Sequence, residues 1–273
     1  MEETKDHIGP LITALQYNDI FDLDSTQTDT EVLPKGTAFS FIKAVQSVNQ
    51  RLVNQISTES LGFEVILIAR EDSEVTKEKI VESVNHYGLG ISKFYFCKNE
   101  ELIKTLQSHK VKLFLSTNRD DIDKALQAGL AAASLYDQLG QHVFDQLKVI
   151  FSGDVIGFSE DSRDSLADFG FSETQLKTFK TAKMCIKEFV SLIGEMRRRF
   201  GRENSPLCTC LITAWGSRDV CTAALKTLRE WGLDVDEAFC LAGAPCSPIL
   251  AVVKPHILWD GGLHNVEDTP AQN

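Results

Sequence analysis

The sequence contains the same order of strands and helices two times. Corresponding residues of the two copies are separated by an almost constant number of residues. Ala69 and Ala214 each end an apolar run typical of a buried strand, and they are 145 residues apart. Gly88 and Gly232, which close the helices that follow, are 144 residues apart. Because alternating strands and helices connect by right-handed crossovers, this repeat predicts a parallel sheet covered by helices on both faces.

Hydrophobic periodicity places the elements of both copies. We expect helices around residues 39–52 and 185–200, a helix that ends near Gly88, and a helix from Ser217 as N-cap to Gly232. The expected strands are 11–15, 63–69, 93–97, 111–115, 147–151, 208–214, 238–241 and 255–259. We therefore predict an N-terminal Rossmann-like half over residues 1–140 and a second half over 141–273, joined near Gly140-Gln141-His142.

The charge balance restricts the expected partners and compartment. The chain has 28 Lys and Arg against 39 Asp and Glu, a formal net charge of −11. An acidic surface repels polyphosphate backbones, so we expect no nucleic acid partner. The charged start, Met1 to Asp6, is unlike a secretory signal, and no apolar run reaches the ~18–20 residues that span a bilayer. We expect a cytoplasmic protein without a membrane partner, and homo-oligomers would be unsurprising.

The cysteines are odd in number and have no metal-ligand spacing. The seven are Cys97, Cys185, Cys208, Cys210, Cys221, Cys240 and Cys246. They are scattered through apolar segments without a Cys-x-x-Cys pair, which indicates reduced packing residues rather than disulfides or zinc ligands.

Ligands of parallel sheets bind outside the carboxyl ends of the strands, and the two copies differ there. Gln16-Tyr17-Asn18-Asp19 follows the first strand of the first copy, whereas Ser152-Gly153-Asp154-Val155-Ile156 follows the corresponding strand of the second.

Several segments elsewhere resemble one protein family: FSFIKAV (39–45), VNHY (84–87), LKTLREWGL (225–233), DEA (236–238), LAGAP (241–245) and KPHI (254–257). The sequence from about Leu11 to Trp259 is similar to the cytosolic type-I 5'-nucleotidases of the haloacid-dehalogenase-like superfamily. The resemblance implies an α/β fold with a haloacid-dehalogenase-like parallel sheet flanked by helices, in which the half over residues 141–273 is the haloacid-dehalogenase-like one and carries the vestigial phosphatase motifs. In a working member it also implies Mg²⁺-dependent hydrolysis of a nucleoside 5'-monophosphate, typically AMP, to nucleoside and phosphate.

The resemblance implies four catalytic features. A first strand ends in Asp-x-Asp, in which the first carboxylate attacks phosphorus and the second acts as general acid and base. A hydroxyl residue and a lysine hold phosphoryl oxygens, and acidic residues after the last strand complete the metal site. Metal and lysine are needed because they offset the repulsion between the nucleophilic carboxylate and the phosphate.

This sequence departs from that pattern at several positions. Ser152 stands at the nucleophile position, Asp154 keeps the acid/base position, and Thr213 keeps the phosphoryl-binding hydroxyl. Trp215 stands where the family usually has arginine, and Cys246 stands at the lysine position.

Both the metal site and the expected activity are reduced by these departures. The usual aspartate pair after the last strand is Asp260-Gly261, so Asp154 and Asp260 are the remaining candidate ligands of a weak Mg²⁺ site. Loss of a nucleophile costs several orders of magnitude in rate. We therefore expect a strongly impaired 5'-nucleotidase; the alternative is a non-catalytic nucleotide-binding or interaction paralogue, a pseudoenzyme.

Other signals have competing interpretations. The segment 21–26 (FDLDST) imitates an Asp-x-Asp-x-Thr signature, but a solvated acidic turn is favoured because the apolar strand ends before it. Arg197-Arg198-Arg199, with Arg202, either binds phosphate or acidic partners or forms the last turn of a helix that stops at Gly201. The helix end is favoured, because cations complement its exposed carbonyls.

Three single residues also carry alternatives. His256 either contacts substrate or is a core histidine, and the core is favoured. Cys246 is either a reactive thiol or a neutral replacement, and Ser152 as a nucleophile in its own right is disfavoured because no histidine or lysine lies near it in sequence.

Overall fold

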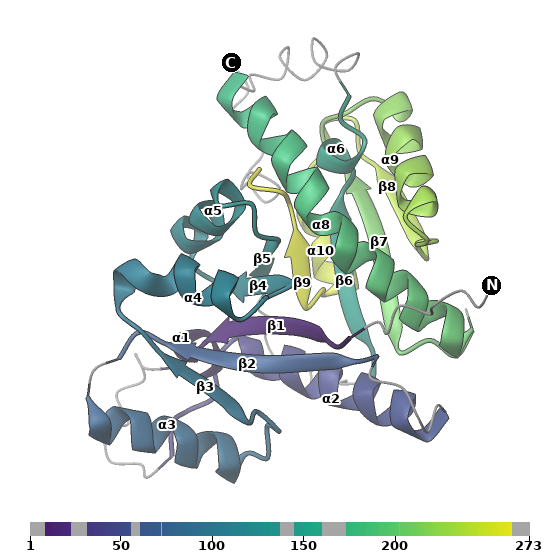
Figure 1. The fold of residues 1–273 in the computed structure, drawn as a ribbon. Coiled ribbons are helices and arrows are strands. Elements are labelled where there is room, and N and C mark those ends of the chain that lie inside the picture. The colour runs from purple at the N-terminus through teal and green to yellow at the C-terminus, as the bar shows by residue number, and fades with distance from the viewer. Residues whose placement is uncertain are drawn as a thin grey trace, which may run out of the picture.

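The computed structural model describes residues 9–22, 32–55, 61–71, 73–136, 145–159, 173–201 and 203–263. Their strands form one sheet in the order β3-β2-β1-β4-β5-β9-β6-β7-β8 (Figure 1). The strands are β1 Leu11–Gln16, β2 Phe63–Ala69, β3 Lys93–Phe96, β4 Leu113–Ser116, β5 Ala132–Leu135, β6 Leu147–Ser152, β7 Leu207–Thr213, β8 Glu237–Cys240 and β9 Ile257–Trp259. The helices are α1 Tyr17–Ile20, α2 Ala38–Gln55, α3 Glu74–His86, η1 Asn99–Glu101, α4 Leu102–Ser108, α5 Arg119–Gln127, α6 Gly153–Ile156, α8 Glu173–Phe200, α9 Arg218–Glu230 and α10 Ser247–Val253.

The two sequence copies are two halves of this one sheet. In the first half, β1 has β2 and then β3 on one side and β4 on the other. In the second half, β6 has β7 and then β8 on one side and β9 on the other, so the arrangement is the same. β2 and β7, β3 and β8, and β4 and β9 each begin 144 residues apart, and β1 and β6 begin 136 apart. The α/β fold and the repeat are therefore confirmed. The expected junction at 140–142 lies outside the described residues.

One pairing departs from the expected parallel sheet. Every strand pair within a half is parallel, but β5 and β9 are antiparallel, with Ser134 opposite Leu258 and Leu135 opposite Ile257. β5 was not predicted, because its four residues are too few to show a clear hydrophobic period. The two half-sheets therefore run in opposite directions, and their carboxyl ends lie at opposite edges of the sheet.

The helix ends follow the signals in the sequence with one exception. Ser73 caps α3 because its side chain accepts a hydrogen bond from the N–H of Thr76, and Gly88 follows at φ 57°. Ser217 stands at the N-cap of α9 as predicted, but its side chain makes no capping hydrogen bond. Two strands begin two residues later than expected: β4 begins at residue 113, and β9 begins at 257, after Pro255, which has no N–H for a strand ladder.

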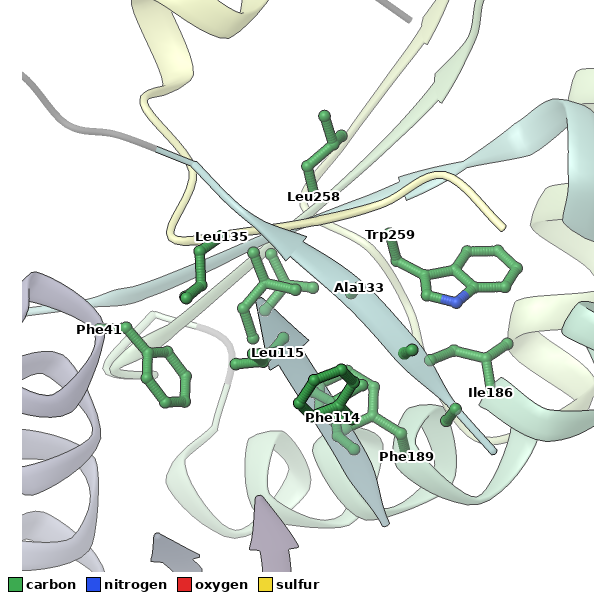
Figure 2. Close-up of a cluster of buried hydrophobic side chains, with 14 of the residues drawn as sticks. Phe41, Phe114, Leu115, Ala133, Leu135, Ile186, Phe189, Leu258 and Trp259 are labelled. Carbon is green, nitrogen blue, oxygen red and sulfur yellow. The ribbon is translucent and has the colours of Figure 1, made fainter. Parts of the chain in front are cut away.

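A buried apolar cluster joins the halves where β5 meets β9 (Figure 2). The labelled side chains come from α2, β4, β5, α8 and β9: Phe41, Phe114, Leu115, Ala133, Leu135, Ile186, Phe189, Leu258 and Trp259. α8 lies on the same side of the sheet as α4 and α5, whereas α2 and α10 lie behind it (Figure 1). Each large apolar side chain buried here stabilises the fold by about 1.5–3 kcal/mol. Among the described residues, no helix is long and apolar enough to cross a membrane.

Candidate functional site

Three neighbouring strands of the second half end beside one another and bring the predicted site residues to one edge. β6 ends at Ser152, which pairs with Ile212 of β7, so Thr213 lies one residue beyond that pair. On the other side of β6, Phe151 pairs with Trp259, and Asp260 follows directly. The sheet thus places Ser152, Thr213 and Asp260 at adjacent strand ends.

Gly153 allows the first two of these strand ends to approach closely. A Cβ atom on Gly153 would lie 2.1 Å from the Thr213 hydroxyl oxygen. Only glycine leaves this space, so the turn from β6 into α6 packs directly against the Thr213 side chain.

Asp154, in the short helix α6, is held by backbone N–H groups that follow β7. Its Oδ2 accepts from the N–H of Ala214 at 2.8 Å, and its Oδ1 accepts from Trp215 at 3.1 Å and Gly216 at 2.5 Å. Burial raises the pKa of the Asp154 carboxyl above its ordinary value, and the three N–H donors oppose that rise. Successive backbone N–H groups form a nest that suits anions, and here an internal carboxylate occupies it. This nest was not predictable from the sequence, because backbone donors leave no side-chain signature.

The hydroxyl groups of Ser152 and Thr213 are buried beside this nest. Neither oxygen has a hydrogen-bond partner among the described residues, although Ser152 is 4% exposed and Thr213 is fully buried. Buried polar atoms are nearly always bonded, so two orphaned hydroxyls at strand ends mark a place where ligand oxygens could be bound.

The loop after β8 remains at this edge and leads to Cys246. The N–H of Leu241 donates to the Thr213 carbonyl at 2.8 Å, and the N–H of Gly243 donates to the Ala214 carbonyl at 2.7 Å. Cys246 is the buried N-cap residue of α10. Neither Cys246 nor the buried Trp215 carries the positive charge of the lysine and arginine that the family resemblance places there.

Comparison with known proteins identifies the family of the chain. A family model described as 5'-nucleotidase matches residues 17–272. The chain belongs to the 5'-nucleotidase family. Human "Cytosolic 5'-nucleotidase 1B" is 33% identical over 247 residues, which cover 86% of this chain and 40% of that relative. This 5'-nucleotidase family member therefore spans less than half the length of that relative.

Magnesium, which the nucleotidase family implies, fits the described residues poorly. Both oxygens of Asp154 already accept backbone N–H groups, and Asp260 Oδ1 accepts from the N–H of Gly262 at 2.9 Å. Within the described parts of the chain, no group of three His, Cys, Asp or Glu residues could hold a metal ion. Mg²⁺ prefers six oxygen ligands, and this edge presents two carboxylates that are already engaged.

The arginine cluster of this nucleotidase family member is part of its scaffold. α8 ends at Phe200 before Gly201, as predicted. Arg197 makes two hydrogen bonds to the Asp236 carboxylate, at 2.7 and 2.6 Å, and a third to the Leu207 carbonyl. Arg198 and Arg199 both pair with Glu195. Arg202 lies outside the described residues, as do residues 23–26 of the acidic segment.

His256 is a core histidine, as favoured from the sequence. It is 2% exposed, and its Nδ1 accepts the N–H of Lys148 at 3.1 Å. Burial lowers the pKa of His256 to about 4, so the ring is neutral at pH 7. It precedes β9 and therefore lies at the amino end of the second half-sheet, at the edge opposite to Asp154.

The carboxyl edge of the first half carries a polar cluster that was not predicted from the sequence. Gln16 Nε2 donates to Ser116 Oγ at 3.1 Å and to Asp121 Oδ2 at 2.9 Å. Arg70 donates to both oxygens of Asp121, at 3.2 and 2.7 Å. The spacing of the repeat could have revealed this cluster. Ser116 ends β4 and Asp260 follows β9, and both the two residues and the starts of the two strands are 144 residues apart.

Proposed function

We propose that this chain binds a nucleoside 5'-monophosphate at the carboxyl edge of β6, β7 and β9 and hydrolyses it far more slowly than a working family member. The observation that carries the proposal is the pair of buried, unpartnered hydroxyls on Ser152 and Thr213, next to Asp154. These hydroxyls could donate to phosphoryl oxygens. Slow hydrolysis is expected because the nucleophile position holds Ser152 and the lysine position holds Cys246.

The physical reason for slow turnover is the protonation state of the groups at this edge. A serine hydroxyl is protonated at neutral pH, and it attacks phosphorus only when a base removes its proton. Asp154 is the carboxylate nearest in sequence, but three N–H donors already hold it. Without the lysine, the negative charge on the phosphate is also less well compensated.

In this proposal the family roles are divided among the residues that remain. Asp154 would act as acid and base, Thr213 would hold a phosphoryl oxygen, and Asp260 would contact a divalent cation together with the substrate phosphate. We expect Mg²⁺ to bind weakly because so few carboxylates are available. We further propose a cytoplasmic location, following the printed name of the human relative, and self-association stays a prediction.

A second candidate function is a non-catalytic role, in which the chain binds a nucleotide or another protein without turnover. The position of Asp154 supports it, because an internal carboxylate occupies the backbone nest that an incoming anion would use. In this role the second half would be a pseudoenzyme.

The test is phosphate release from AMP with Mg²⁺, measured for the wild type and for the double variant Ser152→Asp/Cys246→Lys. We expect little or no release from the wild type and a gain of several orders of magnitude in the double variant. Adding Asp154→Asn to the double variant should abolish the gain. Rapid phosphate release by the wild type, abolished by Asp154→Asn, would contradict the proposal that hydrolysis is slow.

Thermal unfolding with and without AMP tests whether the chain binds the nucleotide. A rise in melting temperature with AMP, absent in Thr213→Val, supports a nucleotide site, and phosphate release then distinguishes slow turnover from binding alone. If AMP leaves the melting temperature unchanged and the double variant recovers no turnover, the nucleotide proposal fails and the interaction role remains.

A further inference from the structure

A cavity lies between the two halves of the chain, away from the candidate site. Its volume is about 560 Å³, which is within the range of pockets that hold small organic ligands. Pro10 and Ile12 line it from the start of the first half, and the last turns of α8, which lie next to the start of β1, line it from the second (Figure 1). Because α8 ends at Phe200, shortly before β7 begins, the cavity is near the amino end of the second half, whereas Asp154 is at the carboxyl end.

One face of α8 forms a wall of this cavity. Glu188, Leu192, Glu195 and Arg198 line it from successive turns of the helix. Arg198 pairs with Glu195, and the Lys112 ammonium lies 2.6 Å from the Glu188 carboxylate. Lys112 precedes β4, so this second ion pair connects the two halves across the cavity. Both carboxylates of the wall therefore already have a cation.

The cavity has one cation more than its carboxylates can pair. Lys110, in the turn between α4 and β4, also lines it and is exposed. Among the described residues, the Lys110 ammonium has no ion-pair or hydrogen-bond partner. The lining thus has three cations and two carboxylates, although the chain as a whole has a net charge of −11. A free cation beside the apolar side chains of Ile12 and Leu192 suits an anionic group attached to an apolar body.

The backbone of Lys110 is in a conformation that favours glycine. Two residues after their last residues, α3, α5 and α9 are each followed by a glycine with positive φ: Gly88, Gly129 and Gly232. α4 has Lys110 at the same place, with φ 52°. Its N–H donates to the Gln107 carbonyl at 3.1 Å, as the N–H of Gly88 donates to Asn85. Glycine would make this helix end without strain, so stability does not explain the lysine, and a strained residue at a cavity indicates a role in binding.

We propose that this cavity binds a small organic anion, a carboxylate or sulfonate attached to an apolar body. Lys110 would contact the anionic group, and Ile12 and Leu192 would contact the apolar body. The ligand would touch both halves, so binding should raise the melting temperature of the full chain by mass action. The inference does not depend on whether the candidate site binds a nucleotide.

The experiment uses two fluorescent probes that differ by one charged group. The full chain is titrated with anilinonaphthalene sulfonate and with N-phenylnaphthylamine, which has the same rings without the sulfonate. We expect saturable binding of one sulfonate probe per chain and weaker binding of the neutral probe. Equal affinity for the two probes would show that no anion is recognised and would overturn the proposal. AMP should not displace the sulfonate probe, and displacement by AMP would assign the probe to the candidate site instead.

Variants of opposite charge effect locate the probe in the cavity. Lys110→Gln should weaken binding of the sulfonate probe about threefold and leave the neutral probe unchanged. Lys104→Gln, at an exposed lysine of α4 that does not line the cavity, is the matched control and should change neither affinity. Glu188→Gln removes a carboxylate from the wall and should tighten binding of the sulfonate probe by a similar factor.

Lys110→Gly separates a role in binding from a role in folding. It removes both the ammonium and the backbone strain, so the melting temperature should rise by about 2–4 °C while the sulfonate probe binds about threefold more weakly. A lower melting temperature would mean that the lysine stabilises the fold. Unchanged probe affinity in both Lys110→Gly and Lys110→Gln would overturn the proposed site, and the melting curves verify that each variant is folded.

Discussion

The carboxyl edges of the two halves hold polar residues at corresponding positions but bond them in different ways. In the first half, Gln16 donates to Ser116 and Asp121, so side chains bond mainly to one another. In the second half, the Asp154 carboxylate accepts backbone N–H groups, and the hydroxyls of Ser152 and Thr213 have no partner among the described residues.

This difference indicates which edge is suited to a ligand. A ligand at the first edge would have to break an ion pair whose carboxylate, Asp121, is 3% exposed on its side chain. A ligand at the second edge could satisfy two hydroxyls that the fold leaves unbonded. The first edge is not fully satisfied either, because one oxygen of the buried Asp19 lacks a partner among the described residues, and burial raises the pKa of that carboxyl. The contrast is therefore one of degree.

The largest effect is expected from removing the carboxylate that organises the first edge. Asp121→Ala leaves Arg70 unpaired and Gln16 without one acceptor, so it should lower the free energy of unfolding by about 4 kcal/mol. Asp120→Ala, at an exposed neighbouring position, is the control and should change it by less than about 0.5 kcal/mol. Urea unfolding measures both, and equal small effects would show that the first edge contributes little.

A smaller loss in the free energy of unfolding is expected when acid protonates His256. This residue lies beside the end of the first half. The N–H of Tyr136, after β5, donates to the His256 carbonyl at 3.2 Å. The folded pKa is about 4, below the ordinary histidine value, so the unfolded chain takes up the proton first as pH falls. The contribution of His256 to the free energy of unfolding is therefore fully present above about pH 6.5. As the pH falls to 4, the chain loses about 3 kcal/mol of this contribution.

The variant His256→Asn isolates this contribution. Asparagine can still accept the Lys148 N–H, so the difference in unfolding free energy between wild type and variant should shrink by about 3 kcal/mol from pH 7 to pH 4. His86→Asn, at an exposed position, is the matched control. A constant difference for His256→Asn across this range would mean that the ring is not held neutral by burial.

Gly153→Ala tests the close packing at the edge of the second half. The corresponding position in the first half is Tyr17. The new Cβ would meet the Thr213 hydroxyl, so we expect a loss of about 2 kcal/mol in thermal or urea unfolding. The double variant Gly153→Ala/Thr213→Ala removes the clashing oxygen and should cost less than the sum of the two single changes. Strict additivity would contradict the contact.

The smallest effects compare one hydroxyl from each edge. Thr213→Val removes an unpartnered buried hydroxyl at nearly constant shape, so it should leave stability unchanged or raise it by up to about 1 kcal/mol. Ser116→Ala removes an oxygen that accepts from Gln16 and from the N–H of Asn118, so it should cost about 1 kcal/mol. A larger loss for Thr213→Val than for Ser116→Ala would reverse the comparison.

Much of the fold was predictable because the chain repeats its elements. The predicted strand 63–69 matches β2, and the predicted helix ends at Gly88 and Gly232 both have positive φ. The antiparallel contact of β5 with β9 was not predictable, since local periodicity carries no information on how two half-sheets meet. The strand pairing and the buried cluster around Phe114 and Trp259 decide it.

The candidate site was predictable only where side chains carry the chemistry. Ser152, Asp154 and Thr213 lie together at one edge because each follows or ends a strand of a parallel half-sheet. The donors that hold Asp154 are backbone N–H groups of residues 214–216, which any residue type except proline supplies. Cys240, predicted as a packing residue, is exposed at the end of the edge strand β8. Its exposure was not predictable either, because the burial of a short edge strand depends on what covers it.

The opposed direction of the two half-sheets has an electrostatic consequence. β1 has six residues, which at about 3.3 Å per residue give a strand of roughly 20 Å. Exposed charges at the two edges are thus separated by about two Debye lengths at physiological ionic strength. Substitutions that change the charge at one edge leave the potential at the other almost unaltered, so each half could gain or lose charged groups independently while both share one core.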